Sequence, residues 1–267
     1  MENTQIKQST NNNLANVVSL FDAITLDEMG DIQLMNRIDT KYVVPISSLC
    51  LLLQAAVPHY FILEMAGERQ LPYHTVYLDT ANKDMYHAHH GGKTARQKIR
   101  IRTYESSCQT FLEVKDKDNH GRTDKKRIAV AGEESWQTEE SLRFLVRHAC
   151  YPCLHLLPQI ENHFFRITLV NRSMTERLTI DTRLCFHNLQ NGVQVQMPQL
   201  AIVELKRSRR ASSPMCGMMR QLRIQPTGFS KYCMGCAMTD TMLKQNRLKP
   251  KIHYVMKVIK QSIQIIS

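Results

Sequence analysis

Residues 98–118, KIRIRTYESSCQTFLEVKDKD, contain two segments in which polar and apolar side chains alternate. The first alternates around Ile99 and Ile101, and the second around Leu112 and Val114. A period of two is typical of β-strands that turn one face to the core. The opposite faces are more basic than solubility requires; they carry Lys98, Arg100, Arg102 and Tyr104 in the first segment and Phe111, Glu113, Lys115 and Lys117 in the second. The pattern predicts paired strands with a cationic face.

Similar basic strand segments recur along the chain. They supply Lys41, Lys125, Lys126, Arg127, Arg166, Arg177 and Lys206. If such strands close into a barrel, alternate residues point inward. An inward row of Arg and Lys must then hold water and an anion, because unpaired buried charges are costly. Solvated strand faces with cross-strand ion pairs are the alternative, and periodicity alone does not separate the two.

Two strand segments place a carboxylate beside a cation. Glu113 precedes Lys115 by two residues, and Glu204 precedes Lys206 by two, so each pair lies on one strand face. Hard oxygen ligands next to phosphate-binding cations suit a Mg²⁺ or Mn²⁺ ion that is shared with a phosphate group.

The overall charge favours polyanionic partners. The formal net charge is +11 over 267 residues, which fits nucleic acid, an anionic membrane surface or phosphate chains. A low aromatic content with a single tryptophan, Trp136, argues against a surface for stacking bases, so nucleic acid is not expected. The chain has no apolar run of the roughly 20 residues that a membrane helix needs and no secretory signal pattern. These features predict a cytoplasmic protein.

The cysteines include two CxxC pairs, Cys150 with Cys153 and Cys233 with Cys236. Together they would supply four thiolates for a structural zinc ion. Pro152 inside the first pair and the lack of flanking glycine-rich knuckles argue against this. Free, buried thiols are the favoured interpretation.

The order of elements predicts an α+β fold with antiparallel strands and helices at both ends. Strands are expected near 32–44, 72–80, 96–105, 109–117, 122–131, 160–170, 175–181, 183–188 and 200–206, and helices near 14–29, 45–57, 82–92, 136–150, 212–224 and 231–246. Within 14–29, Thr25 and Glu28 have the spacing of a capping box, which predicts that a second short helix starts at Thr25. We expect a disordered lead over 1–13, a single domain over 14–246 and a basic amphipathic tail over 247–267. The tail is expected to dock on the domain, with peripheral membrane contact as the alternative. No GxxxxGK[ST] loop is present, so strand side chains would hold any phosphate.

Eight segments, taken in order, resemble the catalytic domain of the vacuolar transporter chaperone (VTC) polyphosphate polymerases. They are LMNRIDTKY, YLDTANKDMY, KIRIRTY, FLEVK, DKKR, ERLTID, VELK and FSKY, over about residues 25–235. The wider group is the triphosphate tunnel metalloenzymes, which includes the CYTH-type triphosphatases. The resemblance implies an eight-stranded antiparallel barrel that forms a tunnel. It also implies that cations in the tunnel grip ATP or polyphosphate, with Mn²⁺ or Mg²⁺ held by glutamate.

The resemblance also implies roles for individual residues. The catalytic candidates are Lys41 of the first strand, Arg100 and Arg102 of an RxR pair, Lys115 of an ExK strand, Arg166 and Arg177 of later strands, and Lys231 of the SKY motif. Lys125 and Arg127 fit the KxR motif, with Lys126 as a further candidate. Lys98 and Lys206 are added as phosphate-binding cations. Glu204 resembles the metal-ligand glutamate, and Glu113 is the second metal candidate.

The activity expected from this resemblance is transfer of the ATP γ-phosphate onto a polyphosphate chain. CYTH enzymes begin with ExExK, whereas the corresponding positions here hold Arg37, Asp39 and Lys41. This departure favours the polymerase branch. A metal-dependent phosphatase acting on tripolyphosphate or polyphosphate, and a module that binds polyphosphate without catalysis, are the alternatives. The expected partners are therefore ATP and polyphosphate, pyrophosphate or tripolyphosphate.

Overall fold

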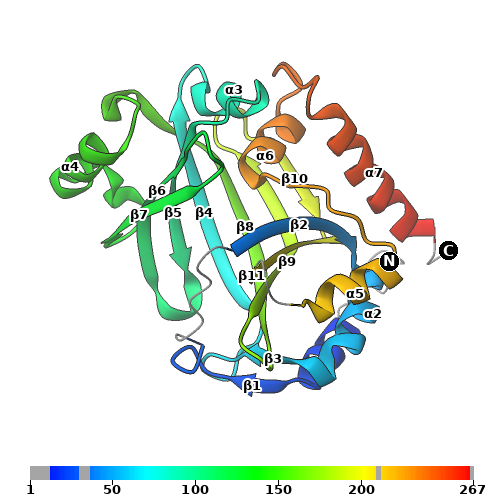
Figure 1. Cartoon of the computed structure of the whole chain (residues 1–267). Coiled ribbons are helices and arrows are strands. Elements are labelled where there is room, and N and C mark those ends of the chain that lie inside the picture. Colours follow the sequence, from blue (N-terminus) through cyan, green and yellow to red (C-terminus); the bar gives the residue numbers. More distant parts are fainter. Residues whose placement is uncertain (1–12, 30–36, 209–211, 265–267) are drawn as a thin grey trace.

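The computed structural model describes residues 13–29, 37–208 and 212–264. Eight strands follow one another by hydrogen bonding in the order β2-β11-β9-β8-β4-β5-β6-β7 (Figure 1). Their bounds are β2 Arg37–Pro45, β4 Leu71–Thr80, β5 Arg96–Tyr104, β6 Gln109–Lys117, β7 Thr123–Val130, β8 Leu156–Asn171, β9 Glu176–Asn188 and β11 Leu200–Ser208. Each neighbouring pair is antiparallel. With helices packed around the sheet, the predicted α+β class is confirmed.

The sheet curves back on itself. Lys206 on β11 is close enough to Lys115 on β6 for its charge to lower the pKa of Lys115. In the order of the sheet, however, β9, β8, β4 and β5 lie between these two strands. In the same way, the charge of Lys98 on β5 lowers the pKa of Lys41 on β2. In the part of the chain that the structure describes, no ladder joins β7 to β2. The eight strands therefore wrap around a shared inner face without a closing ladder between these two strands.

Apolar clusters cover the other side of the strands. Ile99, Ile101, Leu112 and Val114 are at most 2% exposed and pack in a cluster that includes Leu145 of α4 (Glu139–His148). A second cluster joins the sheet to two other helices, α2 (Ile46–Ala56) and α5 (Pro214–Gln221). The residues that alternate with the cations thus form the core, as the period of two predicts.

One end of the inner face is apolar and covered by α6 (Lys231–Thr239). Tyr232 of this helix packs against Tyr77 of β4, with ring centroids 5.3 Å apart. A Cβ at Gly235 would lie only 2.8 Å from Cδ1 of Phe186, so the close approach of α6 to the sheet requires glycine there. The Ser230 hydroxyl accepts a hydrogen bond from the Cys233 amide and caps the helix. This cap places Lys231 at the edge of the cationic region.

The basic tail forms α7 (Lys249–Gln264) and docks on the domain, as expected. Val255 and Val258 are at most 4% exposed and belong to the same cluster as the strands around Ile99. Because these side chains are buried in the protein, they are not available to a lipid surface. Among the described residues, no helix combines the length and hydrophobicity needed to cross a bilayer.

Several predicted boundaries differ from the structure. Residues 13–19 are helical, but the chain then enters β1 (Asp22–Ile24), so the helical stripe predicted from residue 14 ends earlier than expected. Thr25 and Glu28 do exchange the hydrogen bonds of a capping box, yet only a turn follows. The strands expected at 175–181 and 183–188 are one strand, β9, and the helix expected to 246 ends at Thr239. Of the disordered lead predicted over 1–13, residues 1–12 lie outside the described residues, and residue 13 is helical.

Three short strands were not predicted. β3 (Tyr60–Leu63) pairs with β8 and with β1, and β10 (Gln194–Met197) pairs with β9. The helix α3 (Asp84–His90) matches the predicted helix near 82–92. Short 3-10 segments lie at Val57–His59, Glu105–Ser107, Glu133–Gln137 and Cys153–His155.

Candidate active site

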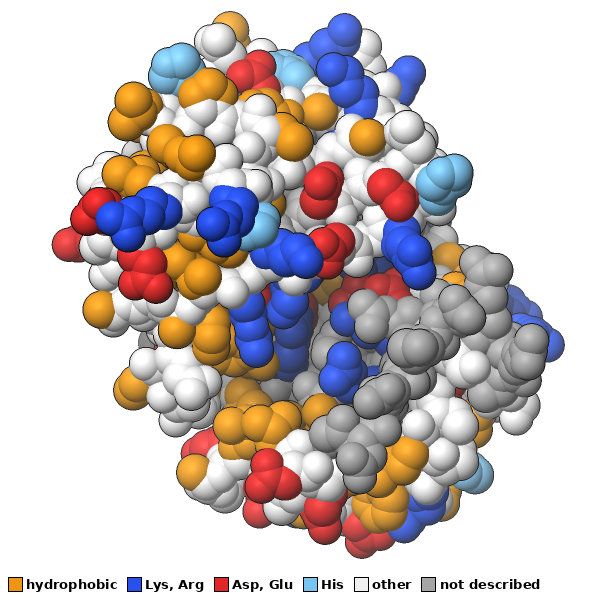
Figure 2. Space-filling model, turned by 60° about the vertical axis from the view of Figure 1, so that its left-hand side comes forward, with side chains coloured by type: hydrophobic (Ala, Val, Ile, Leu, Met, Phe, Trp, Pro, Cys, Tyr) orange, Lys and Arg blue, Asp and Glu red, His pale blue; other side chains and the backbone are white. Residues whose placement is uncertain are grey.

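The inner face of the sheet brings together most of the predicted site residues. On the β5–β6–β7 side, Lys98, Lys115 and Lys125 form one cross-strand row, and Arg100, Glu113 and Arg127 form the next. On the β2–β11–β9–β8 side, Lys41, Glu204 and Thr179 form one row, Asp39, Lys206 and Arg177 a second, and Arg166 lies opposite Asp181. Figure 2 shows a hollow in the molecule in which Lys and Arg side chains gather beside acidic ones.

Lys126 is the exception among the predicted cations. It lies opposite Val114 and thus on the other face of β7 from Lys125 and Arg127. Its ammonium pairs with Asp124 at 3.2 Å, and both side chains are more than half exposed. The period of two therefore favours Lys125 and Arg127 as the pair that faces the site.

Glu113 holds two of the cations in place. Its side chain is fully buried, Arg100 Nε donates to Oε2 at 2.7 Å, and Lys125 Nζ donates to Oε1 at 3.3 Å. Burial alone would raise the pKa of this carboxyl, but Arg100, Arg102 and Lys125 lower it to about 2. Glu113 is therefore ionised at neutral pH and serves as an internal counter-ion.

Asp181 is a second internal counter-ion, on the opposite side of the site. Arg166 binds it with two hydrogen bonds, Nε to Oδ1 at 2.6 Å and Nη2 to Oδ2 at 2.8 Å, and Lys231 Nζ also donates to Oδ2. These cations overcome the effect of burial and lower the pKa of Asp181. Burial lowers the pKa of Lys231 to about 7 even with Asp181 beside it. Asp181 was not among the predicted site residues, although it shares a strand face with Arg177.

Aromatic rings support the same cations. The Arg166 guanidinium lies 4.8 Å from the ring centre of Tyr73, and Lys231 Nζ lies 4.0 Å from that of Phe164. On β7, the Arg127 guanidinium lies 4.4 Å from the ring centre of Phe111. Such contacts hold a cation in a fixed place and leave its remaining donors available for another anion.

Glu204 is the carboxylate that best fits a divalent ion. Lys41 pairs with its Oε1, Lys206 Nζ lies 3.6 Å from Oε2, and its side chain is 22% exposed. Burial and the charge of Lys206 lower the pKa of Lys41 to about 8. Glu113 fits less well, because both of its oxygens already accept from cations and no part of it is exposed. Mg²⁺ is commonly held by one or two carboxylates together with substrate phosphates, and Glu204 suits that arrangement.

Two cations of the inner face, the buried Arg102 and the partly buried Lys115, have no carboxylate partner among the described residues. Arg102 is 7% exposed; its Nε donates a hydrogen bond to Thr75 Oγ1 at 3.3 Å, and its guanidinium lies 5.8 Å from the ring centre of Tyr73. Burial and the nearby Arg100 and Arg166 lower its pKa to about 10. Lys115 makes no ion pair with any residue that the structure describes, and Arg100, burial and Arg102 all lower its pKa. Because uncompensated buried charge is costly, this face is suited to an anion from outside the chain.

The two CxxC pairs do not form a zinc site in the described structure. Cys233 and Cys236 are buried in α6, whereas Cys150 is exposed, and all eight cysteines are free thiols. Among the described residues, the cysteines take part in no group of three potential metal ligands. The interpretation as free, buried thiols holds for Cys233 and Cys236 but not for Cys150.

The strands and the residues of the inner face define the class of the protein, an α+β protein with a cationic sheet face. The family model described as the VTC domain matches residues 36–240. The chain therefore belongs to the VTC domain family. No match was found among curated proteins.

Solved structures give more distant similarities. A Vibrio parahaemolyticus protein described as a candidate adenylate cyclase is 9% identical, with a TM-score of 0.45 over 76% of this chain and 99% of that one. A candidate adenylyl cyclase from Hippeastrum, described as having a dominant triphosphatase activity, is 14% identical, with a TM-score of 0.45 over 79% of this chain and 99% of that one. The PH1819 protein of Pyrococcus horikoshii is 10% identical, with a TM-score of 0.41 over 75% and 98%.

Proposed function

We propose that the chain is a metal-dependent phosphotransferase that moves the γ-phosphate of ATP onto a polyphosphate chain. The observation that carries this proposal is a pair of inner-face cations, the buried Arg102 and the partly buried Lys115, that have no carboxylate partner among the described residues. A phosphate chain would supply the missing negative charge along the whole cationic face. Membership of the VTC domain family supports a phosphate-chain substrate over other polyanions.

The cations divide into two groups by chemistry. Arg100, Arg102, Arg166 and Arg177 would clamp the nucleotide phosphates, since a planar guanidinium matches two phosphate oxygens at once. Lys41, Lys115 and Lys231 would hold the acceptor chain as compact point charges. Glu113 and Asp181 keep the arginines oriented before substrate arrives, so little reorganisation is needed on binding.

The transfer needs no nucleophile from the protein. A terminal oxygen of the acceptor chain attacks the γ-phosphorus, the bond from that phosphorus to the β–γ bridging oxygen breaks, and ADP leaves with the bond electrons. The residues of the inner face align the two phosphate chains and neutralise the charge on the transferred group. A divalent ion held by Glu204 would neutralise further charge on the phosphate oxygens. Water in place of the acceptor would make the same site a phosphohydrolase.

The proposal is tested with the purified protein, γ-labelled ATP and Mn²⁺, with products separated on a gel. We expect a ladder of labelled polyphosphate that Glu204→Gln abolishes and Glu139→Gln preserves. Glu139 is a suitable control because its side chain is 81% exposed on α4. Release of labelled orthophosphate without a ladder would replace the polymerase with a phosphatase. Binding of polyphosphate without any turnover would reduce the site to a binding module.

A matched pair of lysines tests which face binds the phosphate chain. Lys125→Ala is expected to weaken polyphosphate binding roughly three- to tenfold, because it removes a cation from the inner face next to Glu113. Lys126→Ala removes the same charge from the opposite face and is expected to change affinity less than twofold at physiological salt. Isothermal titration with polyphosphate measures both. Equal losses in the two variants would mean that net charge, not the inner face, governs binding.

A further inference from the structure

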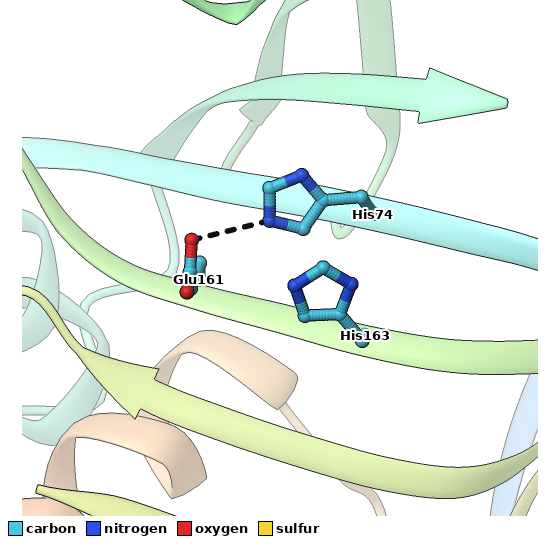
Figure 3. A group of neighbouring side chains, drawn as sticks. All are labelled: His74, Glu161 and His163. Atoms are coloured by element: carbon cyan, nitrogen blue, oxygen red, sulfur yellow. Dashed lines mark hydrogen bonds and ion pairs between the residues drawn. The ribbon is translucent and has the colours of Figure 1, made fainter. Parts of the chain in front are cut away.

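A second cluster of ligand-type side chains lies on the outer face of β4 and β8. Figure 3 shows His74 on β4 facing Glu161 and His163 on β8. Each of these residues offers one potential ligand atom, and the three atoms all lie within 4.8 Å of one another. The two imidazole rings are stacked, with centroids 4.0 Å apart. This group alternates along the strands with Tyr73, Thr75 and Phe164 of the inner face, so it is separate from the cationic site.

Neighbouring carboxylates orient His74, and a further carboxylate lies near His163. His74 Nδ1 contacts Glu133, and its other nitrogen, Nε2, lies 3.3 Å from Glu161 Oε2. His163 Nδ1 lies 3.9 Å from Glu105 Oε1. Histidines that bind metals commonly donate their second ring N–H to a carboxylate, which fixes the tautomer and the ring orientation. His74 has this arrangement already.

A third histidine, His187, contacts the other carboxylate oxygen of Glu161. His187 Nδ1 lies 2.8 Å from Glu161 Oε1, which leaves Oε2 directed toward His74. Exposure then rises across the group: the side chain of His74 is 11% exposed, that of Glu161 23% and that of His163 52%. The cluster is therefore anchored on one side and open to water on the other.

We infer that His74, Glu161 and His163 form a binding site for a divalent transition-metal ion of the Zn²⁺ type. Two imidazole nitrogens and one carboxylate oxygen are ligands that suit Zn²⁺, whereas Mg²⁺ prefers oxygen alone. Three protein ligands leave a coordination position for water on the exposed side. The site needs no phosphate, and it differs in ligand chemistry from the divalent ion proposed at Glu204.

The test uses the full chain with Zn²⁺ by isothermal titration and Co²⁺ by visible absorption, both in excess Mg²⁺ to occupy oxygen-only sites. We expect one Zn²⁺ per chain and a Co²⁺ d–d band. Glu161→Gln and His163→Ala should each weaken Zn²⁺ binding at least tenfold and remove the band. His253→Ala, at an exposed histidine on α7, should change neither.

Folding of the variants is checked by circular dichroism and thermal melting. His163→Ala is the key variant, because the side chain is half exposed and its loss should leave the melting temperature of the metal-free protein unchanged. No Zn²⁺ binding by the wild type would overturn the inference. So would Zn²⁺ binding that both site variants retain, since the cluster would then be a set of histidine–carboxylate ion pairs. Glu204→Gln should bind Zn²⁺ normally, which separates this result from the proposed activity.

Discussion

Glu113→Gln is expected to lower the free energy of unfolding by about 3 kcal/mol at pH 7. The substitution keeps the shape of the side chain but removes the negative charge. It leaves Arg100 and Lys125 without their counter-ion, next to Arg102. Breaking a buried ion pair from one side costs more than the pair contributes, because the remaining charge stays buried. For a chain of this size the melting temperature should fall by roughly 5–10 °C.

The loss of stability caused by Glu113→Gln should disappear in acid. The pKa of Glu113 is lowered from its ordinary value of 4.5 to about 2, so the folded state holds this carboxylate more strongly than the unfolded state does. Its contribution is therefore fully present above pH 4.5 and is lost as the pH falls toward 2. Urea unfolding of wild type and variant over this range measures the difference. If the difference in the free energy of unfolding stays constant from pH 7 down to pH 3, the role of Glu113 as a buried counter-ion is contradicted.

The control for Glu113→Gln is Glu139→Gln. Glu139 also pairs with an arginine, Arg143, but both side chains are more than 70% exposed. Exposed pairs at this helical spacing contribute about 0.3–0.5 kcal/mol. The control should therefore melt within about 1 °C of the wild type. A similar loss in both variants would mean that burial of Glu113 is not the cause.

Polyphosphate should reduce the difference in melting temperature between the wild type and Glu113→Gln. If a phosphate chain lies on the inner face, it supplies negative charge to the cations that Glu113 no longer compensates. The variant should then bind the chain more tightly and gain more stability from it. Thermal melting with increasing polyphosphate measures this. If the difference in melting temperature is unchanged at saturating polyphosphate, the bound phosphate chain does not lie near Arg100 and Lys125.

The sequence predicted the strands that alternate clearly and missed the strands that are short. β5 alternates around Ile99 and Ile101 and β6 around Leu112 and Val114, and the ends of β5, β6 and β7 agree with the prediction to within a residue or two. β1 and β3 have three and four residues, too few to show a period. β9 was divided at residue 182 because the pattern shifts there. The structure has a positive φ at Arg183 and a register shift against β8 near the same point.

Part of the candidate site followed from the same alternation. Because side chains alternate strictly between faces, Arg100, Arg102, Glu113 and Lys115 had to share a face once β5 and β6 paired. The same rule separates Lys126 from Lys125, although three adjacent cations hid this in the sequence. The pairing of Glu204 with Lys41 joins strands about 160 residues apart and became visible only with the β2–β11 ladder.

The remaining groups depend on contacts that no local pattern encodes. Asp181 becomes a counter-ion only because β8 brings Arg166 and α6 brings Lys231 to it. The histidine cluster depends on the long β4–β8 ladder, which places His74 opposite His163. A single histidine in a strand gives no signal of this kind. The short spacing of Glu161 and His163 on one strand face was the available hint.

Three lysines of the inner face predict a strong pH dependence of polyphosphate binding. The pKa is lowered to about 8 at Lys41 and to about 7 at Lys231, and the pKa of Lys115 is also well below its ordinary value. Burial is the main cause at Lys41 and Lys231, and the charge of Arg100 is the main cause at Lys115. The free protein is therefore under-protonated above pH 7. A bound phosphate chain would raise these pKa values, so binding should take up protons.

Proton uptake fixes the sign of the effect. Affinity must fall as the pH rises, by about tenfold per pH unit for each proton taken up. Between pH 7 and pH 9 the affinity for a long polyphosphate is expected to fall on the order of a hundredfold. Isothermal titration in two buffers of different ionisation enthalpy counts the protons directly.

Lys231→Arg supplies the decisive comparison, because arginine stays protonated throughout this range. The variant should lose up to one proton of uptake and show a shallower pH dependence, whereas Lys126→Arg, on the opposite face, should behave as the wild type. Affinity that is constant from pH 7 to pH 9, or equal slopes in the two variants, would show that the phosphate chain does not contact Lys231. In that case the buried lysines would be balanced by Asp181 and Glu204 alone, and the excess cations of the inner face would need a different anion.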